Sequence, residues 1–149
     1  MRYNLWVKLV LDTSVLIAAI RGPGGASARL LDAALAEEVH VLISTPLLLE
    51  YEAVMTRPEH QLVSGLSDEE VGKLLDAFAA IAEHVEFFFT WKPSLNDPDD
   101  EMVMETAVSG GATAIVTFNK RHFQVTAARF GIEIIDPKTA YRRLKDEAK

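Results

Sequence analysis

Hydrophobic and polar residues alternate along the chain in blocks that predict strands and helices in turn. Short apolar runs rich in Val, Leu and Ile, typical of buried strands, occupy residues 7–11, 39–43, 85–89, 112–118 and 132–135. Between them, helical spacing or a capping pattern predicts helices over residues 15–20, 26–38, from 44 onward, 67–84, 98–109 and 137–145. Strands that alternate with helices predict an α/β fold, a three-layer α/β/α sandwich around a mainly parallel sheet.

The composition of the chain limits which classes of protein it can belong to. The chain has 149 residues, of which 49% are hydrophobic, and this predicts one folded domain spanning residues 1–149. No apolar run is long enough to cross a membrane and no signal-peptide pattern opens the sequence, so we expect a cytoplasmic protein with no membrane partner. The chain has no cysteine, which excludes disulfides and thiolate metal sites. A net charge of −7 argues against a broad basic face for nucleic acid but leaves local contacts open.

Asp12 is the first candidate functional residue, because it follows the apolar strand 7–11 directly. Ligands of open parallel α/β sheets bind beyond the carboxyl ends of the strands, where Asp12 would lie. A structural role is equally open, since Asp is a preferred residue at a helix N-terminus and Thr13 and Ser14 begin a predicted helix. The two roles are compatible, because a capping carboxylate can leave one oxygen free.

Glu50 and Glu52 flank the apolar stripe of the helix that begins near Ser44. Helical periodicity alone does not choose between them, and either is explained as a solvated acid at the edge of a buried stripe.

The densest acidic run begins at Asp97 and includes Pro98, Asp99 and Asp100. Its structural explanation is a helix N-terminus, with Asp97 as the cap and later acids favoured by the helix dipole. Asp100 shares a helical face with residues expected to pack on the sheet. An inward-facing carboxylate needs a partner, and a cation is a suitable one.

Thr117 and Asn119 end the strand 112–118, at the same predicted edge as Asp12. They are either a polar turn, with Asn119 capping the next helix, or polar groups of a site. Lys120, Arg121 and His122 follow and could contact a phosphate.

Four segments in this order resemble the PIN-domain family: Leu-Asp-Thr-Ser-Val at 11–15, Leu-Leu-Glu-Tyr-Glu at 48–52, Asp-Pro-Asp-Asp with Ala107 at 97–107, and Ile-Val-Thr-Phe-Asn at 115–119. The likeness spans roughly residues 8–136 and is greatest to single-domain toxins of prokaryotic toxin–antitoxin pairs. No motif is specific alone, whereas the ordered set is fairly specific.

The resemblance implies a PIN-like fold and a ribonuclease that hydrolyses RNA phosphodiester bonds with Mg²⁺ or Mn²⁺. It assigns the metal-binding acids to Asp12, Glu50 and Asp100, with Asp97 as an additional ligand, and so selects Glu50 over Glu52. The fourth family position, often Asp, is Asn119 here. An amide oxygen can still ligate an ion or hold a water molecule, so we count Asn119 among the catalytic residues.

Supporting roles are assigned more weakly. Thr13, Ser14 and Thr117 are candidates to orient carboxylates or water, and Lys120 and Arg121 to contact substrate phosphate. The implied partners are an RNA substrate, a small antitoxin protein and a second copy of the chain in a homodimer or higher homo-oligomer.

Two other functions are alternatives to a ribonuclease. A catalytically weak PIN-like module that binds protein or RNA is favoured by Asn119 and by the acidic composition. A phosphate-accepting receiver domain is disfavoured, because Phe89-Thr90-Trp91, and no acceptor Asp, follows the third predicted strand.

Overall fold

A computed structural model describes residues 7–87 and 97–147. In chain order the elements are β1 (Lys8–Leu11), α1 (Thr13–Arg21), α2 (Ala26–Leu35), β2 (His40–Ile43), α3 (Thr45–Met55), α4 (Pro58–Ser64), α5 (Asp68–Ile81), β3 (Glu83–His84), α6 (Pro98–Gly110), β4 (Ala114–Val116), α7 (Lys120–Arg129), β5 (Glu133–Ile135) and α8 (Pro137–Glu147). The strands form a five-stranded sheet in the order β3-β2-β1-β4-β5, and every pairing is parallel. This architecture confirms the predicted α/β/α fold.

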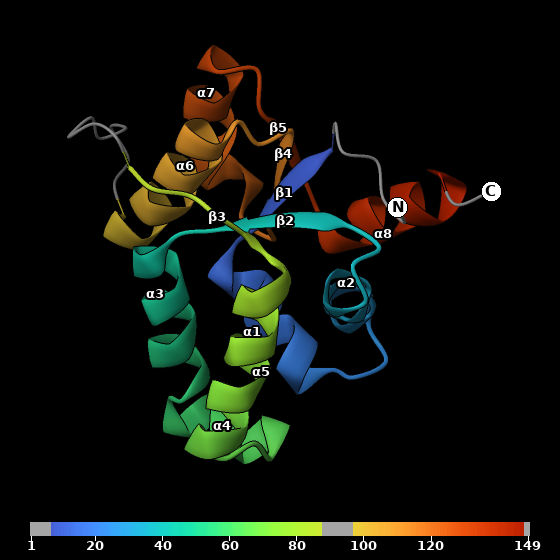
Figure 1. The fold of residues 1–149 in the computed structure, drawn as a ribbon, viewed down its shortest axis with the longest axis vertical. Helices are drawn as coiled ribbons and strands as arrows, with labels where there is room; N and C mark the ends of the chain where they lie inside the picture. Colours follow the sequence, from blue (N-terminus) through green and yellow to red (C-terminus); the bar gives the residue numbers. More distant parts are fainter. Residues whose placement is uncertain (1–6, 88–96, 148–149) are drawn as a thin grey trace.

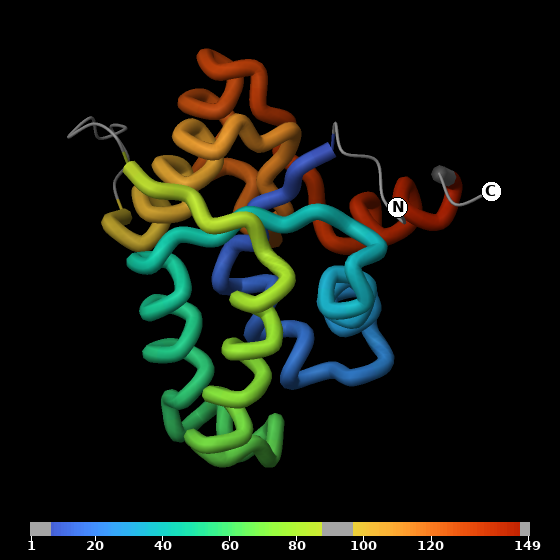
Figure 2. Tube along the Cα trace, in the orientation of Figure 1, coloured from blue at the N-terminus to red at the C-terminus, as the bar shows by residue number. Residues whose placement is uncertain are grey.

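The sheet separates two layers of helices (Figure 1). Helices α6 and α7 lie on one side, and α6 packs on β1, β2 and β4. Helices α1, α2, α3 and α5 lie on the other side, where α3, α4 and α5 follow one another (Figure 2). Burial on both faces explains why the central strands are apolar throughout, and Val10, Leu11, Val41 and Ile115 are fully buried.

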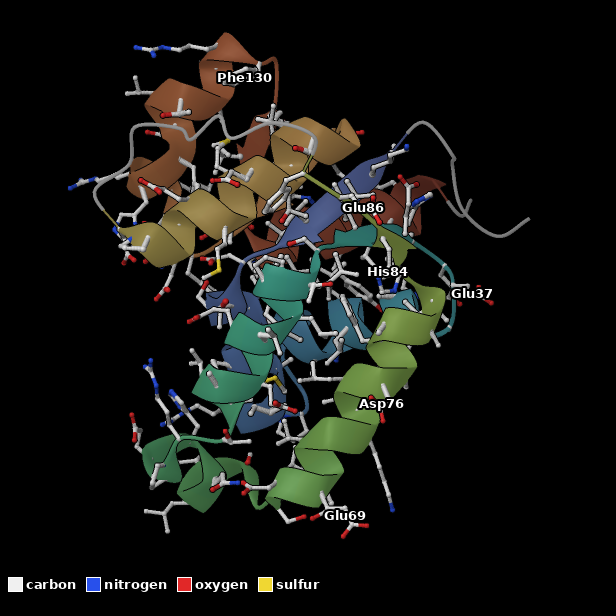
Figure 3. The ribbon with its side chains drawn as sticks, turned by 60° about the vertical axis from the view of Figure 1, so that its left-hand side comes forward. Glu37, Glu69, Asp76, His84, Glu86 and Phe130 are labelled. Atoms are coloured by element: carbon white, nitrogen blue, oxygen red, sulfur yellow. The ribbon has the colours of Figure 1, made fainter. Side chains whose placement is uncertain are left out.

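Capping residues fix the ends of three helices. Ser67 and Glu70 form a reciprocal capping box at the start of α5. The Ser44 hydroxyl accepts a hydrogen bond from the Leu47 backbone N–H at the start of α3. Gly111 ends α6 in the left-handed conformation with φ +66°. Glu69 and Asp76 lie on the outer surface of α5 (Figure 3).

The third strand is not where the sequence predicts it. The apolar run 85–89 favours a strand, but the structure forms β3 from Glu83–His84, and residues 88–89 lie outside the described part of the chain. The cause is the length of β2, whose last residues are the partners of β3. Beyond Val85, whose N–H donates to the Ile43 carbonyl at 2.7 Å, β2 has already ended and α3 begins.

Other boundaries differ for local reasons. The helix predicted over 26–38 ends at Leu35, where the backbone reverses through Glu37 at φ 58° (Figure 3). The predicted strand 112–118 shortens to Ala114–Val116. The sequence did not predict α4, because none of its residues is buried and it therefore carries no apolar stripe.

Gly110 permits a close approach between α6 and the sheet. A Cβ atom there would lie 2.7 Å from side-chain atoms of both Leu42 and Val85. Glycine at this position lets the helix that carries Asp100 pack directly over β2 and the residue that follows β3.

The strand order places a topological switch point at the centre of the sheet. From β1 the chain builds outward through β2 and β3, and β4 then returns to the opposite side of β1. Connections therefore leave the carboxyl ends of β1 and β4 in opposite directions, as at the ligand sites of open α/β sheets. Asp12 follows β1 and Thr117 follows β4 at this point. Among the described residues, no helix is both long and apolar enough to cross a membrane.

Candidate active site

Asp12 is held by hydroxyl groups and does not cap its helix. It occupies the N-terminal position of α1, yet its side chain makes no capping hydrogen bond. Its Oδ2 accepts hydrogen bonds from Thr117 Oγ1 at 2.6 Å and from Ser14 Oγ at 2.8 Å. The side chain is buried, with 6% of the residue exposed. A buried carboxylate fixed in this way has a defined orientation and leaves its other oxygen for a ligand.

Tyr51 supports the strand that precedes Asp12. Its hydroxyl donates a hydrogen bond to the Leu11 backbone carbonyl, and its ring is fully buried against Phe78. Burial, followed by the negative charge of Asp12, raises the pKa of Tyr51 well above its usual range, so the hydroxyl stays a donor. This contact ties the middle of α3 to the carboxyl end of β1.

Asp100 is paired with a histidine and lies near enough to Asp12 to sense its charge. Its Oδ2 is 2.9 Å from His122 Nδ1 at the start of α7. Burial raises the pKa of Asp100, the proximity of His122 opposes this, and the charges of Asp97 and Asp12 raise the pKa further. The Asp12 charge therefore acts on Asp100, and the two carboxyl groups lie in the same part of the molecule.

Glu50 faces a different acid. Burial and then the charge of Asp99 raise its pKa, and a hydrogen bond with the Asp99 side chain adds to the effect. Arg57 acts in the opposite direction. Glu52, the alternative on the same helix, is exposed, whereas Glu50 is half-buried. The surroundings of Glu50 thus distinguish it from Glu52, which periodicity could not.

Asp97 connects these two pairs electrostatically, because its charge raises the pKa of both Glu50 and Asp100. Its own side chain accepts a hydrogen bond from the Asp99 backbone N–H at 2.9 Å and so caps α6. We call Asp12, Glu50, Asp97, Asp99 and Asp100 the acidic cluster. Within the described residues, however, no three Asp, Glu or His side chains stand close enough together to hold a metal ion. Among these residues the structure therefore shows acids near enough to sense one another's charge, but no preformed triad.

A buried pair of hydroxyls positions the two helices that carry the cluster. Ser44 Oγ and Thr106 Oγ1 are 2.8 Å apart, and Thr106 also donates to the Met102 carbonyl at 2.7 Å. This link joins the start of α3 to the middle of α6. It fixes the helix of Glu50 relative to the helix of Asp99 and Asp100.

The remaining predicted residues lie around the cluster. Thr13 is half-buried in the first turn of α1. The Asn119 side chain is exposed and makes no capping hydrogen bond, while its backbone N–H donates to Thr117 Oγ1 at 2.9 Å. Lys120 lies 3.8 Å from Asp136, and Arg121 is exposed on the first turn of α7. Asn119 is therefore near Asp12 through Thr117.

The donor set suits a hard divalent cation. Mg²⁺ is commonly bound by one or two carboxylates, with water and substrate phosphate completing its octahedron. Asp12 and Asp100 provide that number of carboxylates, and a bound cation would favour the ionised form of Asp100, which burial and the nearby acids disfavour. Sequence reasoning missed the supporting contacts of Tyr51, Ser44 and Thr106, because they join segments far apart in the chain and leave no local pattern.

Comparisons with known proteins agree with this architecture. The family profile of the PIN domain matches residues 8–121. A chain of VapBC2 from Rickettsia felis, bound to a DNA fragment from their promoter, has a TM-score of 0.57 and 17% identity, over 87% of this chain and 98% of that one. A chain of DNA-bound VapBC from Salmonella typhimurium has a TM-score of 0.57 and 21% identity, over 88% of this chain and 98% of that one. No curated protein sequence matches the chain significantly. The match to the profile covers most of the chain, which therefore belongs to the PIN-domain family.

Proposed function

We propose that this protein is a ribonuclease that hydrolyses RNA phosphodiester bonds with the help of bound Mg²⁺ or Mn²⁺. The observation that supports it most is the placement of Asp12, which Thr117 and Ser14 hold at the end of the central strand β1, near Asp100 on α6. Membership of the PIN-domain family agrees, since PIN domains are generally nucleases that use divalent metals. We expect the protein to act in the cytoplasm, where RNA is accessible.

In this proposal Asp12 and Asp100 bind the ion directly, and Glu50, Asp97 and Asn119 bind it directly or through water. A bound divalent ion would polarise the phosphodiester and lower the pKa of a water molecule that attacks phosphorus.

The other residues orient these groups. Thr117 and Ser14 hold one oxygen of Asp12, so that the other points to the ligand. His122 orients Asp100. Thr13 is a weaker candidate to orient water, and Lys120 and Arg121 are weaker candidates for substrate phosphate.

We further propose that the protein is the toxin of a toxin–antitoxin pair. The sequence resembles such toxins, and both similar chains belong to VapBC structures bound to DNA. The partner would be a small antitoxin protein that covers the acidic cluster. A homodimer or higher homo-oligomer is also expected, and size-exclusion chromatography with light scattering measures it directly.

The test compares acids that differ in position but not in chemistry. Purified wild-type protein should cleave a fluorescent single-stranded RNA with Mn²⁺ or Mg²⁺ and stop when EDTA is added. Asp12→Asn and Asp100→Asn should fold normally and lose at least about 100-fold in rate, because mechanistic carboxylates each contribute on that scale. Glu50→Gln should lose activity, while the matched control Glu52→Gln should not. Full cleavage by folded Asp12→Asn protein would refute the assignment.

A second function is favoured by one observation: no three acids in the described residues stand ready to hold an ion. It is a catalytically weak PIN-like module that binds RNA or protein. RNA binding without cleavage at any Mg²⁺ or Mn²⁺ concentration would support this function over the first.

A further inference from the structure

A groove adjoins the acidic cluster at the carboxyl ends of β4 and β5. Its volume is about 460 Å³, within the usual range for small-ligand sites. The residues that line it are the segment from Thr117 to His122, which joins β4 to α7, together with Asp136 after β5.

Two of these residues join the groove to the acid pair. Thr117 donates to Asp12 at 2.6 Å, and His122 lies 2.9 Å from Asp100. A phosphodiester placed at Asp12 and Asp100 would therefore have the groove next to it, and one flanking nucleotide would lie between Thr117 and His122.

Phe118 is an exposed aromatic residue in this groove. It follows Val116 and Thr117, which are fully buried, yet 55% of its own surface is accessible. The chain turns from β4 toward α7 here, which leaves the ring outside the core and in the lining of the groove. A ring so placed offers a face on which a flat apolar group can stack.

The charge around Phe118 suits an anion. Helix α7 contains Lys120, Arg121, His122 and Arg129 and no acid, in a chain whose net charge is −7. Lys120 is partly neutralised by Asp136 at 3.8 Å. Arg121 makes no ion pair or hydrogen bond with any residue in the described ranges 7–87 and 97–147. Its guanidinium is therefore the cation in the groove lining that is available for a phosphate.

We propose that this groove binds the nucleotide beside the scissile phosphate of single-stranded RNA, with its base stacked on Phe118 and a neighbouring phosphate on Arg121. The inference rests on the proposed ribonuclease function and adds to it the residues that would hold one base and one neighbouring phosphate. Stacking on a protein ring requires a base that is free of its neighbours, so the site selects single strands over duplex RNA.

The experiment measures binding in EDTA, where no cleavage is expected, by fluorescence anisotropy. The probes are a labelled single-stranded RNA of 12 nucleotides, the same strand with one abasic position moved along it, and the corresponding duplex. Wild-type protein should bind the single strand more tightly than the duplex. One abasic position should weaken binding at least about fivefold, the factor that corresponds to the loss of one base–aromatic stack.

Variants then connect that position to the ring. Phe118→Ala should weaken binding of the intact strand at least about fivefold and should lose the abasic effect, since both changes remove the same contact. Phe118→Trp should retain the abasic effect. Phe118→Leu, which is apolar without a π face, should lose it. Val125→Ala removes an apolar side chain that is 73% exposed on α7 outside the groove, and should bind as wild type does.

A salt titration tests the phosphate contact. Arg121→Gln should reduce the dependence of log Kd on log salt concentration by about one counterion, whereas Arg129→Gln, on the same helix outside the groove lining, should leave it unchanged.

The outcomes separate this inference from the proposed function. If wild-type protein cleaves RNA but Phe118→Ala keeps the full abasic effect, the nucleotide site is refuted and the ribonuclease stands. Equal affinity for duplex and single strand, or no binding of the single strand at low salt, also refutes the site. If wild-type protein never cleaves RNA with Mg²⁺ or Mn²⁺, the proposed function fails, whatever the binding data show.

Discussion

The hydroxyl of Thr117 should be worth several times an ordinary surface contact to the stability of the fold. It donates to the buried Asp12 carboxylate at 2.6 Å and accepts from the Asn119 backbone N–H at 2.9 Å. Thr117→Val removes both hydrogen bonds while keeping the shape of the side chain. A hydrogen bond to a charged group contributes about 1.5–3 kcal/mol, and the orphaned N–H adds a smaller cost because Asn119 is exposed.

We therefore expect the free energy of unfolding to fall by about 2–3 kcal/mol in Thr117→Val. For a chain of this length that corresponds to a decrease in Tm of about 4–12 °C. Urea unfolding followed by circular dichroism measures the first quantity and a thermal scan the second. Cleavage should fall as well, because Asp12 loses one of the two hydroxyl donors that orient it.

The matched control is Thr117→Ser, which keeps the hydroxyl and loses only a methyl group. It should retain both hydrogen bonds, much of the stability and measurable activity. The reasoning is refuted if Thr117→Val unfolds within about 0.5 kcal/mol of wild type, the usual range for surface substitutions. It is also refuted if the serine variant is destabilised as much as the valine variant.

Three further predictions follow from the site and the core. Saturating Mn²⁺ should raise the Tm of wild type by several degrees, since an ion at about 100 times its Kd adds about 2.7 kcal/mol of stability. The Tm of Asp12→Asn or Asp100→Asn should rise far less. Equal shifts in Tm would exclude these two residues as ligands. Burial raises the pKa values of Asp100 and Glu50 above the ordinary 3.8 and 4.5, so folding of the metal-free protein favours their protonated forms. The stability that these two groups contribute is therefore present below about pH 4 and is lost as pH rises through the raised values. Urea unfolding across this range should show a weaker decline in Asp100→Asn, and an identical slope would contradict the cause. Gly110→Ala should destabilise the fold by about 1–3 kcal/mol through overpacking, whereas Gly24→Ala, with no atom within 4 Å of the added Cβ, should change stability little.

The sequence predicts those features of the fold that neighbouring residues in the chain determine, and it fails for features that depend on distant segments. The caps at Ser67 and Asp97 and the buried strand before Asp12 depend on neighbours in the chain, and they are present in the structure. The position of β3 was predicted wrongly, because it depends on where β2 ends and not on the apolar residues after Val85. Helix α4 has no periodic apolar stripe from which it could be predicted, since none of its residues is buried.

The candidate site divides in the same way. The position of Asp12 at a strand end follows from local pattern, and its proximity to Thr117 follows from the parallel sheet that the pattern predicts. The pairing of Glu50 with Asp99 does not, because it depends on how α3 packs against α6. The assignment of these acids as metal ligands remains a prediction.

The central place of β1 in the sheet has a consequence for how such a protein can be controlled. Its neighbours on both sides, β2 and β4, must separate from it before the backbone preceding Asp12 can move. Edge elements open readily in folded proteins, whereas a middle strand is released only when the whole structure melts. An inhibitor that tried to displace Asp12 would need to spend nearly the full free energy of unfolding. A molecule that covers the acidic cluster would need only its own binding energy, so we expect natural control of this protein to work by occlusion.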